Sequence, residues 1–312
     1  MRHLIDPFDF SLEETHRVLE TAARIEADPV AYKDVASRKR LATLFYEPST
    51  RTRLSHEAAM MNLGGSVMGF PSANVSSVSK GETAEDTIRM IGCYADIAAM
   101  RHPIAGTPAA AAEVSKIPVI NAGDGGNNHP TQTLLDLYTI QKRMGRLDHL
   151  TIGFCGDLKF GRTVHSLSKA LSRYPGNRFV FISPEDLKMP ADLVQEHLSG
   201  HSCLETVSLE EAIGDLDILY MTRIQQERFA SQEEYLRFKG VYILDAEKMK
   251  HAKENMAVLH PFPRVDEIKT DVDSDPRAAY FEQAQNGVYT RMAVIMALLN
   301  LSDPKTGEEI LK

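Results

Sequence analysis

Residues 41–53 read LATLFYEPSTRTR, an apolar run followed by a turn that ends in hydroxyls and arginines. The run 41–46 predicts a short buried strand, and the segment 51–63 after it predicts a helix. The STRTR segment therefore stands where a strand gives way to a helix. Such junctions, repeated along a chain, are typical of an α/β fold.

Strands and helices are predicted to alternate in both halves of the chain. The predicted buried strands are 41–46, 66–70, 97–101, 118–121, 151–155, 179–183, 217–221 and 257–259. The predicted helices are 51–63 (with Leu54, Ala58 and Met61 on its apolar face), 83–94, 130–144, 161–173, 191–199, 232–238 and 286–301. This alternation predicts two α/β domains, each a parallel sheet flanked by helices, and 312 residues suit two domains.

The composition limits the classes of partner. Lys and Arg total 35 against 43 Asp and Glu, a net charge of −8, so the chain is a poor general binder of nucleic acid or of an anionic membrane. An anionic ligand must instead meet a local cluster of cations. The apolar run 292–299 is too short to span a bilayer, and residues 1–6 have no apolar signal core. We therefore expect a cytoplasmic protein.

The three cysteines, Cys93, Cys155 and Cys203, lie far apart and form no C-x-x-C pair. This spacing fits a reducing compartment and argues against a metal site built on thiolates. We expect all three side chains to be buried apolar filler.

The 49–53 segment, Ser-Thr-Arg-Thr-Arg, has two interpretations. Backbone N–H groups at a helix start, together with hydroxyls and a cation, form a cradle for an anion. The alternative is an N-cap followed by solvated arginines. Three hydroxyls and two arginines in five residues exceed what capping needs, so a phosphate site is favoured.

Arg101 and His129 could contribute to the same site. Arg101 ends a predicted strand, where ligands of doubly wound sheets bind, although an edge arginine would look the same. His129 stands at the N-terminus of the helix 130–144, behind the glycine-rich turn 123–128. A helix N-terminus disfavours imidazolium, so a neutral His129 could donate to a developing oxyanion. The alternative is a capping histidine.

Other polar segments follow strands of the second half. The stretch 156–163, GDLKFGRT, resembles a P-loop except that Arg162 replaces the lysine, and arginine is the better fork for a carboxylate. Arg223 and Gln225 would share one face if the chain is extended there. The turn 260–264, HPFPR, offers carbonyl acceptors. Lys80, in the loop 71–82, taken alone predicts only a solvated lysine.

In order and spacing, these segments together resemble the aspartate carbamoyltransferase family over nearly the whole chain. The ornithine-specific relatives typically carry cysteine in the H-P-x-Q motif and an H-C-L-P segment. Here the corresponding segments are HPTQ at 129–132 and HPFP at 260–263. Phe262 departs from the leucine that is usual in the family.

The resemblance implies transfer of the carbamoyl group from carbamoyl phosphate to the α-amino group of L-aspartate, an early step of pyrimidine biosynthesis, with no cofactor and no metal. It implies a carbamoyl-phosphate-binding domain over 1–131, on which the C-terminal helix segment 286–312 packs back. It also implies an aspartate-binding domain over 132–285. We expect these activities and boundaries on that basis.

The resemblance also implies residue roles. The phosphate and carbamoyl group would be bound by Ser49, Thr50, Arg51, Thr52, Arg101, His129, Gln132 and the carbonyls of Pro261 and Phe262. The catalytic groups would be Arg51, Thr52, His129 and Lys80. Aspartate would be bound by Lys80, Arg162, Arg223 and Gln225.

The family's assembly implies partners as well. Ser76 and Lys80 would enter the site of a neighbouring subunit in a homotrimer with shared active sites, and a separate regulatory chain could contact residues 103–112. Three alternatives remain from the sequence. They are an ornithine carbamoyltransferase, a nucleotide hydrolase that uses 156–163, and a non-catalytic homologue that acts as a binding protein.

Overall fold

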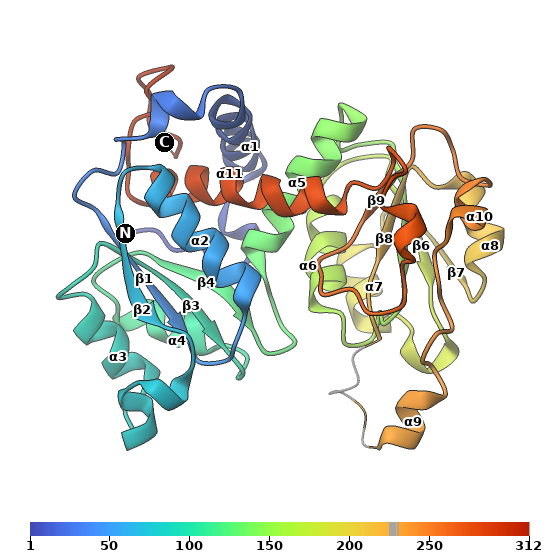
Figure 1. Ribbon diagram of the computed structural model, residues 1–312, viewed down its shortest axis with the longest axis horizontal. Helices are drawn as coiled ribbons and strands as arrows, with labels where there is room; N and C mark the ends of the chain where they lie inside the picture. Colours follow the sequence, from blue (N-terminus) through green and yellow to red (C-terminus); the bar gives the residue numbers. More distant parts are fainter. Residues whose placement is uncertain (225–228, 230, 312) are drawn as a thin grey trace. The chain divides into compact units, whose positions relative to one another are not determined.

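The computed structural model describes residues 1–224, 229 and 231–311, which form two compact units (Figure 1). The first unit consists of Met1–Tyr138 and Gln285–Lys312, and the second of Thr139–Ala284. The sequence prediction placed these divisions at 131/132 and 285/286. Each unit is built on its own parallel sheet.

The first unit has a four-stranded sheet in the order β2-β1-β3-β4, with every neighbouring pair parallel. Its strands are β1 (Arg40–Phe45), β2 (Ser66–Phe70), β3 (Ile97–His102) and β4 (Val119–Asp124). Its helices are α1 (Leu12–Ala27), α2 (Thr50–Asn62), α3 (Ala84–Ile91) and α4 (Thr107–Val114), with the first part of α5 (Pro130–Met144) and most of α11 (Tyr280–Leu298).

The winding of this sheet reverses between β1 and β3. The chain runs from β1 through α2 to the edge strand β2, and then returns past β1 to form β3 and β4. Because parallel crossovers are right-handed, the helices before and after the reversal cover opposite faces, as α2 and α4 do in Figure 1. The ends of β1 and β3 lie side by side, with Phe45 paired to Arg101.

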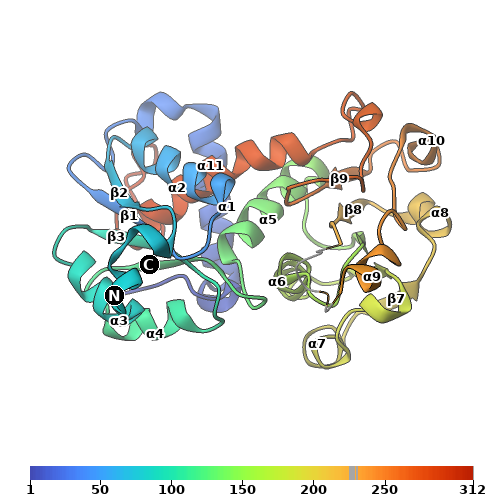
Figure 2. The ribbon, with the colours of Figure 1, turned by 60° about the horizontal axis from the view of Figure 1, so that its bottom comes forward.

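The second unit repeats this plan with five parallel strands in the order β7-β6-β5-β8-β9. The strands are β5 (Thr151–Cys155), β6 (Arg178–Ile182), β7 (Ser202–Thr206), β8 (Ile218–Met221) and β9 (Ala257–Leu259). The helices are α6 (Arg162–Leu171), α7 (Ala191–His197), α8 (Leu209–Ala212), α9 (Gln232–Leu236) and α10 (Ala246–Met249). Here the winding reverses between β5 and β8, and Figure 2 shows α6 and α8 on opposite sides of the strands.

Apolar side chains cover the faces of both sheets. In the first unit Leu44, Met100 and Val119 pack with Ile88 of α3 in one buried cluster. A cluster in the second unit includes Met221 and Val258 of the sheet. The sheet of the second unit also carries the stacked rings of Phe154, Phe179 and Phe181. These cores fix the strand ends from which the polar loops emerge.

The predicted α/β alternation is confirmed, with differences at particular elements. Strands 66–70, 151–155 and 257–259 and helix 130–144 have the predicted bounds. The first of these strands, β2, is largely exposed because it is the sheet edge, so its expected burial was wrong. The prediction missed α1, α4, α8, α10 and β7, and the last helix begins at Tyr280 instead of residue 286.

The apolar face predicted for α2 was wrong. Leu54 and Met61 are 55% and 54% exposed, whereas Thr52, His56, Ala59 and Met60 are buried. The buried face contains polar side chains, and His56 Nδ1 donates a hydrogen bond to the Thr52 carbonyl at 2.8 Å. Apolar periodicity therefore marks the wrong side of this helix.

The expectation for the cysteines holds only for Cys155, which is buried, because Cys93 and Cys203 are exposed. Burial raises the pKa of the Cys155 thiol. Among the described residues, no helix has the length and apolar character needed to cross a membrane.

The corrected face of α2 can be tested with two neighbouring methionines. Met60 is fully buried over Gly65, and Met61 points outward. We expect Met60→Ala to lower the free energy of unfolding by about 2–5 kcal/mol, because a buried side chain leaves a cavity. Met61→Ala serves as the matched control and should change it by less than about 0.5 kcal/mol. Denaturant unfolding followed by circular dichroism measures both changes. A larger loss in Met61→Ala than in Met60→Ala would support the face that was predicted from the sequence.

Candidate active site

The start of α2 lies just beyond the end of β1. Ser49 is the N-cap residue in extended conformation, yet its side chain makes no capping hydrogen bond. Capping therefore does not account for this hydroxyl, which favours the anion-cradle interpretation of 49–53. The backbone N–H groups of the first turn point toward the same end of the helix.

The two arginines of this segment have different surroundings. Arg53 Nε donates to Glu57 Oε1 at 2.7 Å, and that carboxylate also accepts from Thr43 Oγ1 at 2.9 Å. Arg51 is exposed, and its charge is near enough to lower the pKa of Arg101. The structure thus gives Arg53 a structural ion pair and brings Arg51 and Arg101 together.

Arg101 is mostly buried at the end of β3. Burial lowers the pKa of its guanidinium, the carboxylate of Glu47 opposes this change, and Arg51 adds to the lowering. Arg101 Nη2 lies 2.5 Å from Glu47 Oε1, and Nη1 donates to the carbonyl of Ala122 at 3.4 Å. A buried cation beside a second cation is an arrangement that a polyanion would stabilise. Sequence reasoning missed Glu47, although it stands only two residues before Ser49 of the STRTR segment.

The loop before α5 is organised by Asp124. Its carboxylate accepts hydrogen bonds from the backbone N–H groups of Asn128 and Gly106 and from the side-chain amides of Asn121 and Asn127. His129 follows this loop and is 4% exposed, with Thr131 Oγ1 at 3.4 Å from its Nδ1. The sequence marked the turn by its glycines and asparagines but not Asp124 as its centre.

Gln132 lies in the first turn of α5 and is half-buried. Its Nε2 donates to Oδ1 of Asp136 at 2.8 Å, and Asp136 is fully buried. Gln132 was a predicted site residue, and Asp136 was missed by sequence reasoning.

Ser76 and Lys80 lie in a loop of two short 3₁₀ turns, Ala73–Val75 and Ser77–Lys80. The hydroxyl of Ser76 donates to the carbonyl of Ala73 at 2.8 Å and caps the second turn. Lys80 is exposed and makes no ion pair within the described part of the chain. The structure thus places Ser76 and Lys80 in one loop of the first unit.

In the second unit, Arg162 and Arg223 follow the neighbouring strands β5 and β8. Arg162 is the first residue of α6, after the N-cap Gly161. Gly156 has φ +124°, and a side chain there would lie 2.2 Å from the carbonyl oxygen of Thr222. Glycine therefore lets the ends of β5 and β8 approach closely at the reversal of the winding.

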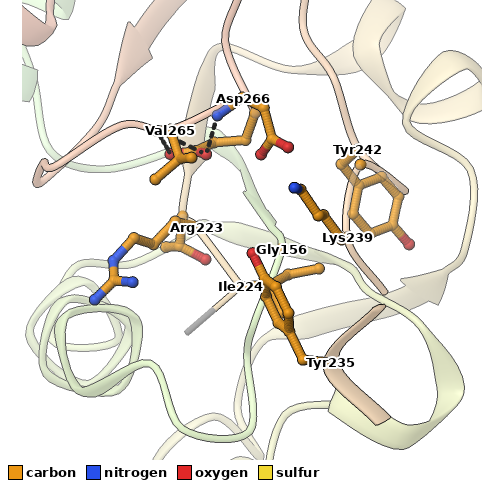
Figure 3. A pocket seen from close by; sticks show the side chains of 11 residues that line it. Gly156, Arg223, Ile224, Tyr235, Lys239, Tyr242, Val265 and Asp266 are labelled. Carbon is orange, nitrogen blue, oxygen red and sulfur yellow. Dashed lines mark hydrogen bonds between the residues drawn. The ribbon is translucent and has the colours of Figure 1, made fainter. Parts of the chain in front are cut away.

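A pocket opens at this reversal, and Figure 3 shows Arg223, Lys239 and Asp266 around it. Gly156 and Thr222 form part of its lining, and Tyr235 closes one side. Two cations, Arg223 and Lys239, and two carboxylates, Asp266 and Glu267, make it a polar hollow that suits a small charged ligand. The prediction for Gln225 lies outside the described residues, and Lys239 carried no motif by which sequence reasoning could have found it.

The turn after β9 is held by His260. Its Nδ1 accepts from the backbone N–H of Phe262 at 2.8 Å, so Nε2 carries the proton and donates to Glu267 Oε1 at 2.7 Å. Burial raises the pKa of Glu267, but the hydrogen bond from His260 and nearby backbone donors outweigh it, and the net change is a lowering. The conformation of Pro261 and Phe262 is thereby fixed.

The ring of Phe262 is turned into an aromatic cluster. Its centroid lies 5.5 Å from that of Phe281 and 5.8 Å from that of Tyr280. Phe262 has φ +56°, an uncommon conformation for a bulky residue, and the surrounding rings help to hold it. The side chain of Phe262 thus packs in the aromatic cluster, whereas the carbonyl proposed as a contact belongs to the backbone of the turn.

The described residues contain no group of three or more His, Cys, Asp or Glu side chains that could hold a metal ion. The cations found above instead suit anionic ligands. The sites of the two units are each formed where a parallel sheet reverses its winding, which is where such sheets bind ligands.

Comparison with known proteins agrees with this geometry. Residues 2–142 match the family domain described as aspartate/ornithine carbamoyltransferase, carbamoyl-P binding domain, and residues 148–298 match the corresponding Asp/Orn binding domain. The aspartate carbamoyltransferase catalytic subunit of Lachnoclostridium phytofermentans is 62% identical over 96% of this chain and 99% of its own length. That of Clostridium botulinum strain Langeland is 59% identical over 96% and 98%.

Solved structures give the same result. The catalytic subunit of M. jannaschii aspartate transcarbamoylase has a TM-score of 0.89 at 46% identity, covering 96% of this chain and 98% of that one. The aspartate transcarbamoylase of Trypanosoma cruzi, in complex with N-(phosphonacetyl)-L-aspartic acid, has a TM-score of 0.89 at 39% identity and 94% coverage of both chains. The chain therefore belongs to the aspartate/ornithine carbamoyltransferase family, and its nearly full-length relatives are aspartate carbamoyltransferase catalytic subunits.

Proposed function

We propose that this chain is a cytoplasmic aspartate carbamoyltransferase that converts carbamoyl phosphate and L-aspartate to N-carbamoyl-L-aspartate and phosphate, an early step of pyrimidine biosynthesis. One observation carries the proposal. Each unit places arginines at the point where its sheet reverses, Arg51 and Arg101 in the first and Arg162 and Arg223 in the second. Both substrates are anions, and guanidinium groups bind phosphate and carboxylate as bidentate forks.

Carbamoyl phosphate would bind to the first unit through its phosphate. The hydroxyls of Ser49, Thr50 and Thr52 and the cations Arg51 and Arg101 supply donors around one helix N-terminus. The carboxylate of Glu47 matches the charge of Arg101 in the structure. A phosphate dianion carries twice the charge of that carboxylate and is the stronger partner.

The carbamoyl group would be oriented by groups of opposite polarity. Arg51, Thr52 and His129 donate to its oxygen and stabilise the oxyanion of the tetrahedral intermediate. Its NH₂ group needs acceptors, which we assign to the side chain of Gln132 and the carbonyls of Pro261 and Phe262. His260 holds the last two in place.

Aspartate would be bound in the second unit by its two carboxylates. Arg162, Arg223 and Gln225 are the proposed contacts, with Lys80 added from a neighbouring subunit. The amine attacks the carbamoyl carbon, the new C–N bond forms, the bond to the phosphate oxygen breaks, and the departing phosphate accepts the amine proton. This chemistry requires no covalent intermediate, cofactor or metal, so positioning and charge supply the catalysis.

The choice of acceptor is the first test. We expect turnover of carbamoyl phosphate with aspartate and not with ornithine, because the cation on the ornithine side chain would be repelled by Arg223. Arg223→Ala should weaken the use of aspartate by about tenfold or more, since a charge-assisted contact contributes about 1.5–3 kcal/mol. The KM for carbamoyl phosphate should stay within about twofold, since Arg223 contacts only the acceptor in this proposal.

Steady-state assays with both acceptors measure these effects, and Arg178→Ala provides a matched control. Arg178 is an exposed arginine at the start of β6 in the same unit, and its loss should change neither constant. A preference for ornithine would contradict the proposed substrate. Equal losses toward both substrates in Arg223→Ala would remove Arg223 from the aspartate contacts.

The role of His129 is the second test. If His129 donates to the oxyanion, His129→Ala should lower kcat by about 10²–10³, while a bisubstrate analogue still binds. His149→Ala is the control, because His149 is an exposed histidine of the second unit and should leave kcat unchanged. Unchanged turnover in His129→Ala would reduce His129 to a helix cap.

We further propose a homotrimer with shared active sites. Lys80 is exposed and makes no ion pair within the described residues, although the family resemblance gives its lysine a substrate contact. Both statements hold if the 71–82 loop reaches a neighbouring subunit across a heterologous interface. A separate regulatory chain is proposed to contact residues 103–112, where Ile104 is 65% exposed.

Mixing two inactive variants tests the shared site. Lys80→Ala and Arg51→Ala chains, unfolded together and reassembled, should regain up to about one native site per mixed trimer, because one interface then joins two intact partners. The control mixes Lys80→Ala chains with the Lys80→Ala/Arg51→Ala double variant, in which no interface is intact. If trimers form and the first mixture remains as inactive as the control, Lys80 serves its own subunit.

A further inference from the structure

Arg291 of α11 is a buried cation that the proposed reaction does not use directly. Its side chain is 3% exposed, and Nη1 donates to the carbonyl of Gly287 at 2.9 Å. Burial lowers its pKa to about 10, although the charge of Asp136 raises it. Its Nε finds no hydrogen-bond partner within the part of the chain that the structure describes. Such a cation is costly to bury, so its position calls for a reason beyond packing.

Gly287 makes room for this guanidinium. A side chain at Gly287 would lie 2.4 Å from Nη1 of Arg291 and 3.1 Å from Cδ2 of Leu135 in α5. Glycine weakens a helix interior, because it is flexible in the unfolded chain. Gly287 nevertheless stands in the helix at the point where the side chain of Arg291 lies between α11 and α5.

Asp136 joins Arg291 to the proposed substrate contacts. It is 0% exposed, it accepts from Nε2 of Gln132 at 2.8 Å, and its charge acts on Arg291. An ionised carboxylate has only acceptors, so the Gln132 amide must turn its NH₂ group toward it. The amide oxygen then points the other way and can accept from another donor.

The identity of that donor follows from the substrate. The carbamoyl group carries an NH₂ with two N–H donors, so it needs the oxygen of Gln132 and not its nitrogen. Without a nearby cation, a fully buried carboxyl favours its neutral form, which is itself a donor and would admit the reversed amide. By keeping Asp136 ionised, Arg291 thus keeps the NH₂ group of Gln132 turned toward Asp136.

We propose that Arg291 and Asp136 are positioning residues that fix the orientation of the Gln132 amide, so that its oxygen accepts a hydrogen bond from the NH₂ group of carbamoyl phosphate. In α2, burial and the charge of Arg291 lower the pKa of His56, whose Nδ1 donates to the Thr52 carbonyl at 2.8 Å. The inference rests on the proposed function, because it assigns the carbamoyl group to Gln132.

A pair of ligands isolates this hydrogen bond. Acetyl phosphate has the shape of carbamoyl phosphate but carries a methyl group in place of the NH₂. The wild-type chain should bind carbamoyl phosphate about tenfold more tightly than acetyl phosphate, the range of one hydrogen bond. In Arg291→Met and Asp136→Asn, the affinity for carbamoyl phosphate should fall toward that for acetyl phosphate, which should itself change less than about twofold.

Calorimetric titration of the full-length chain measures both affinities, and kinetics give a second readout. The KM for carbamoyl phosphate should rise about tenfold in Arg291→Met while the KM for aspartate stays within about twofold. Arg291→Lys retains the charge that keeps Asp136 ionised and should restore most of the preference. If Arg291→Met does not fold, Gly287→Ala displaces the guanidinium instead. This variant should also lower the preference for carbamoyl phosphate over acetyl phosphate.

The pair Arg24 and Asp303 provides the matched control. Arg24 Nε donates to Asp303 Oδ2 at 2.8 Å in the same unit, and Asp303 is 1% exposed. Arg24→Met should lower the melting temperature and leave the ligand ratio unchanged. Wild-type chain that neither binds nor turns over carbamoyl phosphate would overturn the proposed function. The positioning role would be overturned if the wild type is active but the folded Arg291→Met and Asp136→Asn variants keep the wild-type ratio of affinities for the two ligands. It would also be overturned if these variants lose affinity equally for carbamoyl phosphate and acetyl phosphate.

Discussion

A parallel sheet can offer loops from two neighbouring strands to one ligand only where its winding reverses, because elsewhere the crossover helices cover the space between adjacent loops. Both sheets of this chain obey that constraint. In the first, the reversal between β1 and β3 joins the STRTR turn to Arg101 through the pairing of Phe45 with Arg101. In the second, Gly156 allows the ends of β5 and β8 to meet beside Arg223. The position of each site is therefore a consequence of strand order.

Charge then determines what these positions can bind. The chain has a net charge of −8, so its cations act locally and do not create a general affinity for anions. Arg101 is buried beside Arg51, and the carboxylate of Glu47 compensates its charge. An arrangement of this kind stores part of the binding energy for a polyanion, since the ligand relieves repulsion between cations that the fold already holds together. The fold itself is stabilised elsewhere, by the apolar clusters on the sheets.

Local sequence patterns predicted the strand-helix junctions and most residues that follow strand ends, because apolar runs, glycines and hydroxyls act over short distances. They failed for α2, where the buried face carries Thr52 and His56 and the apolar Leu54 is exposed. They also failed for Asp136 and Arg291, because the electrostatic interaction between these two residues connects positions that are far apart in the chain. A lone aspartate in a helix looks the same whether it is solvated or buried. Only the packing of α5 against α11 distinguishes the two.

Four of the residues that sequence reasoning missed share one chemical property. Glu47, Asp124, Asp136 and Glu267 are carboxylates that accept hydrogen bonds from groups at or beside the proposed contacts. A carboxylate cannot donate when ionised, so each one determines which way its partner faces, whether that partner is a guanidinium, an amide or an imidazole. Glu267, together with the N–H of Phe262, defines the tautomer of His260, and Asp136 defines the orientation of Gln132. The acidic excess of the chain thus has a use inside the fold, because acceptors of fixed polarity pre-organise the donors and acceptors that a reacting carbamoyl group would meet.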